Sequence, residues 1–373
     1  MTKPVCVLIA GGGTGGHLFP GLALAQQLAL RGATVFFVGT QKGIEATAVP
    51  QAGFPIDFID IAGLKRQGFG PTVRALLKLP VAFFQTLRLL LRLRPHIVVG
   101  VGGYASGPAV LLAFCLRIPT VILEQNSIPG LTNRILSRVA RQVFAAFPQT
   151  RSFFPAHKVA LLGNPIRAQI VEAAGRKTLS QAGPVNLLVL GGSLGAKAVN
   201  TLVFEALILL QKHPELAPLG GRLRVRHQTG AADFADVKAR YENMPGLAVD
   251  VVPFIADMAG AYAEADLMVG RAGATTLAEL TAMGLPALLI PFPFAADDHQ
   301  THNARYLADQ GAAHLLPQAD TTPEKLAQVL AHLLCRRAEL SAMAESSRKL
   351  GRPGAAGEIA GVLLNCVNRG LHR

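Results

Sequence analysis

Residues 270–279, Gly-Arg-Ala-Gly-Ala-Thr-Thr-Leu-Ala-Glu, have the types and spacing of a nucleotide site. They follow a short apolar run at 267–269 and open a segment whose apolar residues recur at helical spacing. Small residues let a ligand approach the main chain, and the first turn of a helix attracts an anion such as phosphate. Glu279, more than one turn later, could accept hydrogen bonds from ribose hydroxyls. The alternative is an ordinary strand–loop–helix joint in which Glu279 points to solvent.

Other glycine-rich stretches have the same setting. Residues 11–17, Gly-Gly-Gly-Thr-Gly-Gly-His, follow an apolar run and precede an apolar helical pattern, which is typical of a phosphate-binding joint. Residues 102–108 and 191–197 also follow apolar runs. A dinucleotide-binding Rossmann site would need an acid at the end of its second strand. Residues 39–42, Gly-Thr-Gln-Lys, contain none, so a nicotinamide or flavin site is disfavoured.

The glycine-rich stretches can form binding sites only if the fold brings the ends of the preceding strands together. Apolar strand-like runs alternate with helical patterns, which predicts parallel sheets with helices on both faces. The second half repeats the strand, glycine loop and helix of the first. We therefore predict an α/β fold of two Rossmann-like doubly wound domains facing each other across a cleft. The predicted domains are residues 1–165 and 184–350, with a linker at 175–184 and a last helix, about 353–367, that packs back on the first domain.

Polar residues end one of the predicted strands of the first domain. Glu124, Gln125 and Asn126 follow the apolar run at 120–123. In an open α/β sheet the carboxyl ends of the strands form the ligand crevice, so these side chains are functional candidates. Asn126 is equally explained as a turn residue.

Composition points to an anionic partner. The chain has 36 Lys and Arg against 23 Asp and Glu, a formal net charge of +13. Such an excess suits nucleic acid, an acidic membrane surface or phosphorylated substrates. Aromatic residues make up only 6% and Trp is absent, so no nucleic-acid partner is expected. Cysteines are scattered without a C-x-x-C pair, which predicts buried free thiols in a reducing compartment and no zinc site.

Residues 64–94 are unusually apolar and basic. At helical spacing Arg74, Lys78, Gln85, Arg88 and Arg92 share one face, and most of the remaining surface is Leu, Val and Phe. One interpretation is a crossover helix packed on the sheet with a narrow polar edge. The other is an apolar patch, rimmed by these residues with Lys65 and Arg66, that binds an anionic membrane surface. The charge excess favours the second.

The ordered motifs resemble those of one family. The chain resembles the glycosyltransferases of GT-B fold and, among them, the enzymes that make peptidoglycan lipid II. The resemblance covers nearly the whole length. It rests on residues 12–17 with 19–21, 100–107, 124–126, 163–167, 191–196, 253–258 and 270–279, and on Gln300 with Asn303.

The resemblance implies a fold, a reaction and a location. Members of the family transfer N-acetylglucosamine from UDP-GlcNAc to the 4-hydroxyl of undecaprenyl-pyrophosphoryl-muramyl-pentapeptide, lipid I, and so form lipid II. The implied transfer inverts the anomeric carbon and needs no metal or other cofactor. The acidic pair Asp297-Asp298 could hold a metal but is equally explained by a helix N-cap before Gln300, so a metal-independent transfer is favoured. The protein is then expected to be peripheral at the cytoplasmic face of the inner membrane.

The resemblance also implies residue roles. Ile255 would hold the uracil edge through its backbone, Glu279 the ribose, Gln300 the sugar hydroxyls, and Arg167 would add charge at the diphosphate. The family often has a second polar amide where this chain has His299 and a Ser where it has Ala272, so some sugar contacts would differ. The remaining implied contacts are Thr14, Gly15, Gly16, Asn126, Ser193, Ala274, Thr275, Thr276, Leu277 and Ala278 for the donor, and Gly103, Tyr104, Ala105 and Ser106 for the acceptor.

Two residues are candidates for the general base that deprotonates the acceptor. His17 ends a glycine loop and would titrate near neutrality. Its alternative role is to donate a hydrogen bond to a phosphate or to the loop. Glu124 is the second candidate.

Other functions fit the same motifs. One alternative is another UDP-sugar-dependent GT-B enzyme, either with a different lipid or aglycone acceptor or an epimerase. Another is a non-catalytic protein that binds nucleotide sugars or docks on membranes, although His17, Glu124, Arg167 and Gln300 together exceed what binding alone requires.

Overall fold

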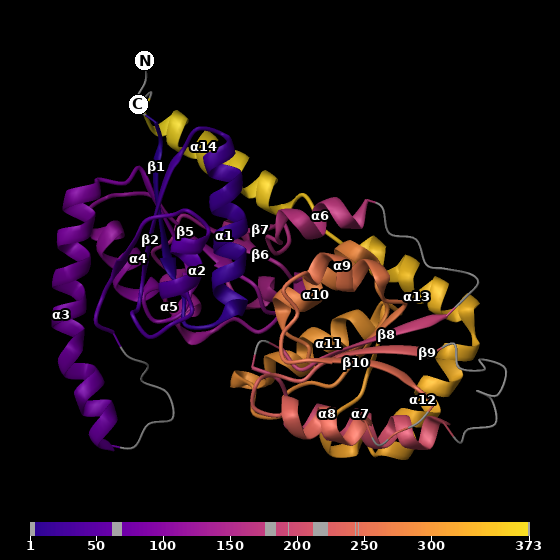
Figure 1. Cartoon of the computed structure of the whole chain (residues 1–373). Helices are drawn as coiled ribbons and strands as arrows, with labels where there is room; N and C mark the ends of the chain where they lie inside the picture. The colour runs from indigo at the N-terminus through magenta and orange to yellow at the C-terminus, as the bar shows by residue number, and fades with distance from the viewer. Residues whose placement is uncertain are drawn as a thin grey trace. The chain divides into compact units, whose positions relative to one another are not determined.

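The computed structural model describes residues 4–61, 69–175, 184–192, 194–211, 223–242, 244 and 246–371, with the backbone alone at 69–77 and 369–371. The chain divides into two compact units. Unit 1 is Met1–Arg167 with Arg352–Arg373, and unit 2 is Ala168–Gly351. Each unit is an α/β layer structure in which helices cover a parallel sheet (Figure 1).

Unit 1 contains a seven-stranded sheet in the order β3-β2-β1-β4-β5-β6-β7, in which all neighbouring strands are parallel. Its strands are β1 (Cys6–Gly11), β2 (Thr34–Gly39), β3 (Ile56–Phe58), β4 (Ile97–Gly102), β5 (Thr120–Glu124), β6 (Gln142–Ala145) and β7 (Val159–Leu161). Its helices are α1 (Gly15–Leu30), α2 (Glu45–Gln51), α3 (Phe69–Leu93), α4 (Ser106–Cys115), α5 (Leu131–Leu136) and α14 (Ala355–Leu371), with 3-10 helices η1 (Pro148–Phe153) and η2 (Ala156–Lys158).

Strand β1 is apolar throughout because both of its faces are covered. Val7 and Ile9 lie in one core cluster with residues of α1 and α14. Leu8 and Ala10 point to the other face, into a cluster that includes residues of α3 and α4. The C-terminal helix α14 packs against α1, so the end of the chain completes the core of unit 1.

Unit 2 repeats the plan with a six-stranded parallel sheet in the order β10-β9-β8-β11-β12-β13. Its strands are β8 (Val185–Leu190), β9 (Leu223–Gln228), β10 (Ala248–Val252), β11 (Leu267–Gly270), β12 (Ala287–Leu289) and β13 (Ala313–Leu315). Its helices are α6 (Ala168–Ala174), α7 (Lys197–Gln211), α8 (Phe234–Glu242), α9 (Met258–Glu264), α10 (Ala274–Met283), α11 (His299–Asp309), α12 (Pro323–Cys335) and α13 (Arg337–Leu350), with 3-10 helices η4 (Ala296–Asp298) and η5 (Gln318–Asp320).

The predicted fold class is confirmed: both sheets are parallel and doubly wound. The predicted linker at 175–184 falls almost entirely outside the described residues. The prediction of buried thiols is wrong for Cys115 and Cys335, which are exposed near the ends of α4 and α12.

Helix α3 keeps a polar edge, but that edge is engaged within unit 1. Lys78 lies 2.8 Å from Asp60 and Arg92 lies 2.6 Å from Asp57, so the segment around β3 compensates both charges. Gln85 accepts a hydrogen bond from the Asp60 N–H. Lys65, Arg66 and the side chain of Arg74 lie outside the described residues. Among the helices in the described part of the chain, none has the length and apolarity needed to cross a bilayer.

Candidate functional site

The glycine-rich stretches lie at the point in each sheet where the direction of winding reverses. In unit 1, β1 and β4 are neighbours, and the chain continues from them toward opposite edges of the sheet. In unit 2, β8 and β11 have the same relation. Ligands of open α/β sheets bind outside the carboxyl ends of strands at this switch point. The fold therefore gives each unit a candidate ligand site made of its own two glycine loops.

The two loops of unit 1 touch each other. Gly103 has φ +81°, and a Cβ there would lie 2.5 Å from the carbonyl oxygen of Gly12. A Cβ at Gly11 would collide with the carbonyl oxygen of Gly102. Only glycine fits at these contacts, which explains why both loops are rich in it.

Ser106 and Tyr104 divide the second loop into a buried and an exposed part. The Ser106 hydroxyl is fully buried, donates to the Ala10 carbonyl at 2.7 Å and accepts from the Gly102 N–H at 3.1 Å. Ala105 is also buried, whereas the Tyr104 side chain is 47% exposed. Ser106 therefore supports the loop from beneath, and Tyr104 is the loop side chain that a ligand can reach.

Glu45 is a functional candidate that the sequence reasoning missed. Its buried carboxylate accepts hydrogen bonds from the Gly13 N–H at 2.7 Å, the Thr40 N–H at 2.9 Å and the Thr40 hydroxyl at 2.8 Å. A Cβ at Gly12 or Gly43 would collide with this carboxylate, and one at Gly39 would collide with Cγ of the same side chain. Glu45 thus fixes the first loop to the end of β2. The sequence signal that could have identified Glu45 is an acidic residue six positions after β2, at the start of the next helix.

The first turn of α1 carries the remaining unit 1 candidates for the donor. Thr14 is the N-cap residue, in extended conformation, and is exposed together with Gly16. Gly15 packs so closely on Phe19 that a Cβ would lie 2.9 Å from the Phe19 ring. Arg167 lies over the same ring, 5.5 Å from its centroid. The structure therefore brings Arg167 to the start of α1.

His17, in the same turn, is half-buried. Its Nδ1 lies 3.1 Å from Oε1 of Gln125, the residue that follows β5. The sequence motif contained Gln125 but gave no reason to assign it a role.

Glu124 ends β5 and is almost completely buried. Burial raises the pKa of its carboxyl group to about 7, against the opposing effect of hydrogen bonds from Asn126 and Asn133. The Asn126 N–H donates to it at 3.0 Å and the Asn133 amide at 2.8 Å. A carboxyl group with this pKa can exchange a proton near neutrality.

In unit 2, the start of α10 forms the predicted anion site. Gly273 is the N-cap residue, and the helix begins at Ala274. Thr275, Thr276 and Ala278 are partly exposed, whereas Ala274 and Leu277 are buried in the unit. Contacts from the buried residues to a ligand would therefore involve the backbone. Ser193, the candidate on the loop after β8, lies outside the described residues.

Glu279 is buried, so the alternative in which it points to solvent is wrong. Its side chain is 2% exposed, and its Oε2 accepts a hydrogen bond from the Tyr262 hydroxyl at 3.2 Å. Tyr262 belongs to α9, which packs against α10. Ile255 is buried in the loop before α9, where Asp257 caps the helix by accepting from the Gly260 N–H at 2.9 Å. The uracil candidate therefore lies just before α9, and the ribose candidate lies in the neighbouring helix α10.

Arg271 organises the loop that leads to Gln300, and the sequence reasoning assigned it no role. Its guanidinium donates to the carbonyls of Ile290 and Pro291, at 3.0 and 2.9 Å, and to Gln318 at 2.8 Å. Gln300 accepts from the Phe292 N–H at 3.0 Å. Both interactions hold the segment after β12.

Asp298 occupies the N-cap position of α11, but its side chain makes no capping hydrogen bond to the backbone. Its carboxylate accepts from the Thr301 hydroxyl at 2.7 Å. Within the residues described above, no three His, Cys, Asp or Glu side chains gather in a group that could hold a metal ion.

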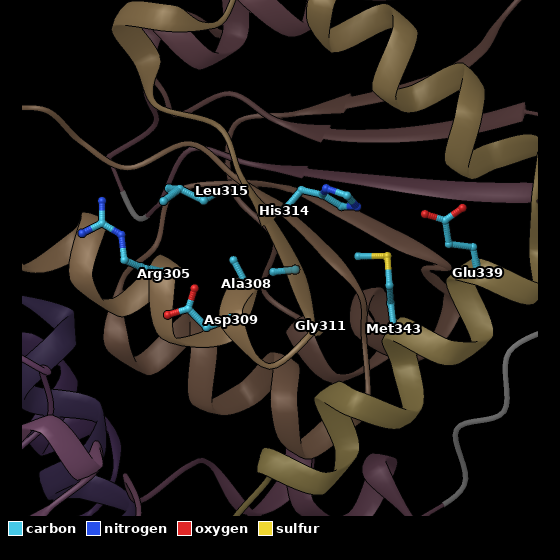
Figure 2. A pocket seen from close by; sticks show the side chains of 9 residues that line it. Arg305, Ala308, Asp309, Gly311, His314, Leu315, Glu339 and Met343 are labelled. Carbon is cyan, nitrogen blue, oxygen red and sulfur yellow. The ribbon is translucent and has the colours of Figure 1, made fainter.

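A separate pocket of about 540 Å³ lies in unit 2, away from the predicted residues. It is lined by parts of α11, β13 and α13, including His314, Glu339 and Met343 (Figure 2). None of the predicted site residues lines it.

Known proteins match the chain over nearly its full length. The family models "Glycosyltransferase family 28 N-terminal domain" and "Glycosyltransferase family 28 C-terminal domain" match residues 7–145 and 186–359. The fold and these matches define a glycosyltransferase with two doubly wound domains. A curated protein of Anaeromyxobacter sp. (strain K), the UDP-N-acetylglucosamine--N-acetylmuramyl-(pentapeptide) pyrophosphoryl-undecaprenol N-acetylglucosamine transferase, is 50% identical over 97% of this chain and 93% of its own.

Solved structures resemble the chain either in both sequence and fold or in fold alone. The crystal structure of Acinetobacter baumannii MurG has a TM-score of 0.76 at 37% identity, over 97% of this chain and 100% of its own. A putative UDP-N-acetylglucosamine 2-epimerase from Listeria monocytogenes has a TM-score of 0.63 at 15% identity, over 96% of this chain and 95% of its own, which shows a shared fold alone. The chain belongs to the family of UDP-N-acetylglucosamine--N-acetylmuramyl-(pentapeptide) pyrophosphoryl-undecaprenol N-acetylglucosamine transferases.

Proposed function

We propose that the protein transfers N-acetylglucosamine from UDP-GlcNAc to the 4-hydroxyl of undecaprenyl-pyrophosphoryl-muramyl-pentapeptide. One observation supports the proposal besides family membership. Each unit has its own pair of glycine loops at the point where the strand order of its sheet reverses, after β1 and β4 in unit 1 and after β8 and β11 in unit 2. Both proposed substrates contain a pyrophosphate, so the reaction needs two anion-binding sites. An enzyme with a single nucleotide-sugar substrate needs only one.

The donor binds mainly to unit 2. The N–H groups at the start of α10 meet the diphosphate, Glu279 holds the ribose hydroxyls and the backbone of Ile255 holds the uracil edge. Gln300 reads the sugar hydroxyls with its amide group. We assign further donor contacts to Ser193 and, from unit 1, to Thr14, Gly15, Gly16, Asn126 and Arg167.

The acceptor binds to unit 1. Its pyrophosphate lies along the first and second glycine loops, where backbone N–H groups offer donors and Tyr104 offers an exposed ring. We assign Gly103, Ala105 and Ser106 to shaping this loop, since the Ser106 hydroxyl is engaged beneath it.

The reaction is a single displacement. The acceptor oxygen attacks the anomeric carbon, the bond from that carbon to the diphosphate breaks, and the proton of the hydroxyl passes to a base. We propose His17 as this base, with Glu124 as the second candidate. Helix N–H groups and Arg167 stabilise the charge on the departing UDP, so no metal is required for that task.

Release of UDP tests the function. Purified protein should release UDP from UDP-GlcNAc only when a lipid-linked muramyl-peptide is present, and a chelator should leave the rate unchanged. His17→Ala should lower kcat with little change in KM for UDP-GlcNAc. If KM rises while kcat holds, His17 binds the donor instead. Turnover without acceptor would point to an epimerase or hydrolase, and no turnover would point to a binding protein.

We also propose that unit 1 binds an anionic membrane surface and so places the protein at the cytoplasmic face of the inner membrane. Helix α4 packs between α3 and α5, and all three present large apolar side chains to solvent. Arg88 is exposed on the same stretch of α3, and Arg117 follows α4. Exposed large apolar side chains gathered on neighbouring helices are typical of an interaction site. The exposed side chains are Val81, Phe84, Leu91, Leu111, Phe114, Leu131 and Ile135.

A further inference from the structure

Gln125 connects the proposed base to the centre of the unit 1 sheet. Its side chain is 1% exposed. Nε2 donates to the carbonyl oxygen of Val101, in β4, at 2.9 Å, and Oε1 lies 3.1 Å from Nδ1 of His17. The amide, in the loop after β5, therefore links strand β4 to the first turn of α1.

The chemistry of these partners fixes the orientation of the amide. A backbone carbonyl can only accept, so the NH₂ group of Gln125 must face Val101. The oxygen of the amide then faces His17. Amide orientations are often ambiguous, but here the alternative would place two acceptors against each other.

The orientation of the amide fixes the proton on His17. An amide oxygen accepts hydrogen bonds, so Nδ1 of His17 must carry a hydrogen to make this contact. In the neutral ring the lone pair is then on Nε2. The ring also packs on the second loop, because a Cβ at Gly102 would lie 2.6 Å from His17 Nδ1. Packing against Gly102 thus fixes the position of the His17 ring, whereas the hydrogen bond to Gln125 fixes its tautomer.

We propose that Gln125 is a positioning residue that holds His17 in the Nδ1–H tautomer, with Nε2 as the atom that takes the acceptor proton. The inference deepens the proposed function and rests on it for the role of Nε2. The tautomer itself does not depend on turnover. In the displacement, the proton of the 4-hydroxyl passes to Nε2 while Nδ1–H remains bonded to Gln125 and orients the resulting imidazolium.

The first experiment measures the tautomer without substrate. Protein labelled with ¹⁵N at histidine is observed by long-range ¹H–¹⁵N NMR above the pKa of His17, and the signals are assigned by loss in His17→Gln. We expect the Nδ1 resonance of His17 at the position of a protonated ring nitrogen and Nε2 at that of a nitrogen with a lone pair. The opposite pattern would overturn the proposal, whether or not the protein is a transferase.

Variants then separate positioning from structure. Gln125→Met should give a mixture of His17 tautomers and lower kcat on the order of 10- to 100-fold, as for other groups that orient a functional histidine, with KM for UDP-GlcNAc nearly unchanged. Gln125→Glu can make both contacts when its buried carboxyl group is protonated toward the Val101 carbonyl, so it should retain the His17 tautomer and most of the kcat that Gln125→Met loses.

A control reports the effect of losing a buried amide elsewhere. Gln228, in β9, is also buried and donates to a backbone carbonyl, that of Pro253, at 3.3 Å. Gln228→Met should leave the His17 resonances in place. If Gln125→Met does not fold, the wild-type tautomer and the Gln125→Glu protein still decide: a mixture of His17 tautomers in a folded Gln125→Glu protein contradicts the proposal. If turnover fails in all proteins while the tautomer is as expected, the proposed function is wrong and the positioning contact remains.

Discussion

At the scale of single residues, the candidate sites of the two units contain buried carboxyl groups with different hydrogen-bond partners, among them Glu279 and Glu124. Glu279 accepts a hydrogen bond from a buried tyrosine in unit 2, and Glu124 accepts from an amide and a backbone N–H in unit 1. Buried carboxylates without a functional or structural reason are rare, because desolvation of the charge is unfavourable. We therefore expect Glu279 to affect UDP binding and Glu124 to affect the pH dependence of stability.

Glu279→Gln should weaken UDP itself, not only the sugar portion of the donor. A hydrogen bond to a charged group contributes about 1.5–3 kcal/mol, so the Kd for UDP should rise about 10- to 100-fold in calorimetry. Glu264→Gln is the matched control, since that carboxylate on neighbouring α9 is exposed and pairs with Arg226. Unchanged UDP affinity in Glu279→Gln would assign the residue to the Tyr262 contact alone.

The Glu124 carboxyl should make stability depend on pH. Its pKa is about 7 in the folded protein against 4.5 for the ordinary group, so the folded state binds the proton more tightly. Its contribution is fully present below about pH 4.5 and is lost as pH rises through about 7, a change of about 3 kcal/mol. Urea unfolding of wild type and Glu124→Gln between pH 5 and about 8 measures it. The two curves should converge at low pH, and parallel curves would contradict the shift.

At the scale of elements, the sequence predicted the strands that are covered on both faces, whereas it did not predict the edge strands β7 and β13. β1, β4, β8 and β11 are mainly apolar runs followed by glycine, and β5 is an apolar run that ends at Glu124, because parallel strands buried on both faces need mostly apolar residues. β7 and β13 are three-residue edge strands with partly exposed side chains, so no periodic signal identified them. The glycine loops were visible from spacing alone.

Long-range hydrogen bonds explain what the sequence could not predict at the site. Glu45 and Gly13 are 32 residues apart, and Gln125 and His17 are 108 apart. No local pattern encodes which strand ends become neighbours, because that depends on the order of strands in the sheet. The candidates themselves came from motifs, whereas the contacts that orient them required the fold.

The first glycine loop should depend on Glu45. Glu45→Ala leaves the Gly13 and Thr40 N–H groups without their acceptor and should destabilise the protein by about 3 kcal/mol in urea unfolding. The KM for the lipid-linked acceptor should rise, since the loop loses its anchor. Glu358→Ala, at an exposed glutamate of α14, should change neither quantity. A stable Glu45→Ala protein with unchanged KM would show that the loop holds its conformation without this carboxylate.

At the scale of the whole molecule, the net charge of +13 and the exposed apolar side chains of α3, α4 and α5 have a common explanation in the membrane proposal. The sequence predicted that the basic residues on the polar edge of α3 rim the membrane-binding surface. In the structure, Lys78 and Arg92 of this polar edge are paired with aspartates. Within the membrane proposal, we therefore expect the apolar side chains to contribute more of the binding than the basic ones.

Phe84 is 69% exposed and should insert into the bilayer surface. Full transfer of a Phe side chain from water stabilises by about 1.5–3 kcal/mol, so Phe84→Ser should lower the partition coefficient for anionic vesicles roughly tenfold in co-sedimentation. Added salt should weaken wild-type binding further. Leu30→Ser, at an equally accessible apolar side chain at the end of α1, serves as the control. Equal loss in both variants, or no binding at any salt concentration, would contradict the proposal.

The return of α14 to unit 1 has a consequence for synthesis on the ribosome. Ile359, Ala360, Leu363 and Val367 belong to the same core cluster as β1 and α1, which are translated first. Unit 2, residues 168–351, can complete its own sheet before these residues exist. The N-terminal unit therefore waits for a helix made some 340 residues later, measured from residue 15 to residue 355. A nascent chain that stops after unit 2 would expose apolar core at its N-terminal half, which marks such incomplete products for chaperones and proteases.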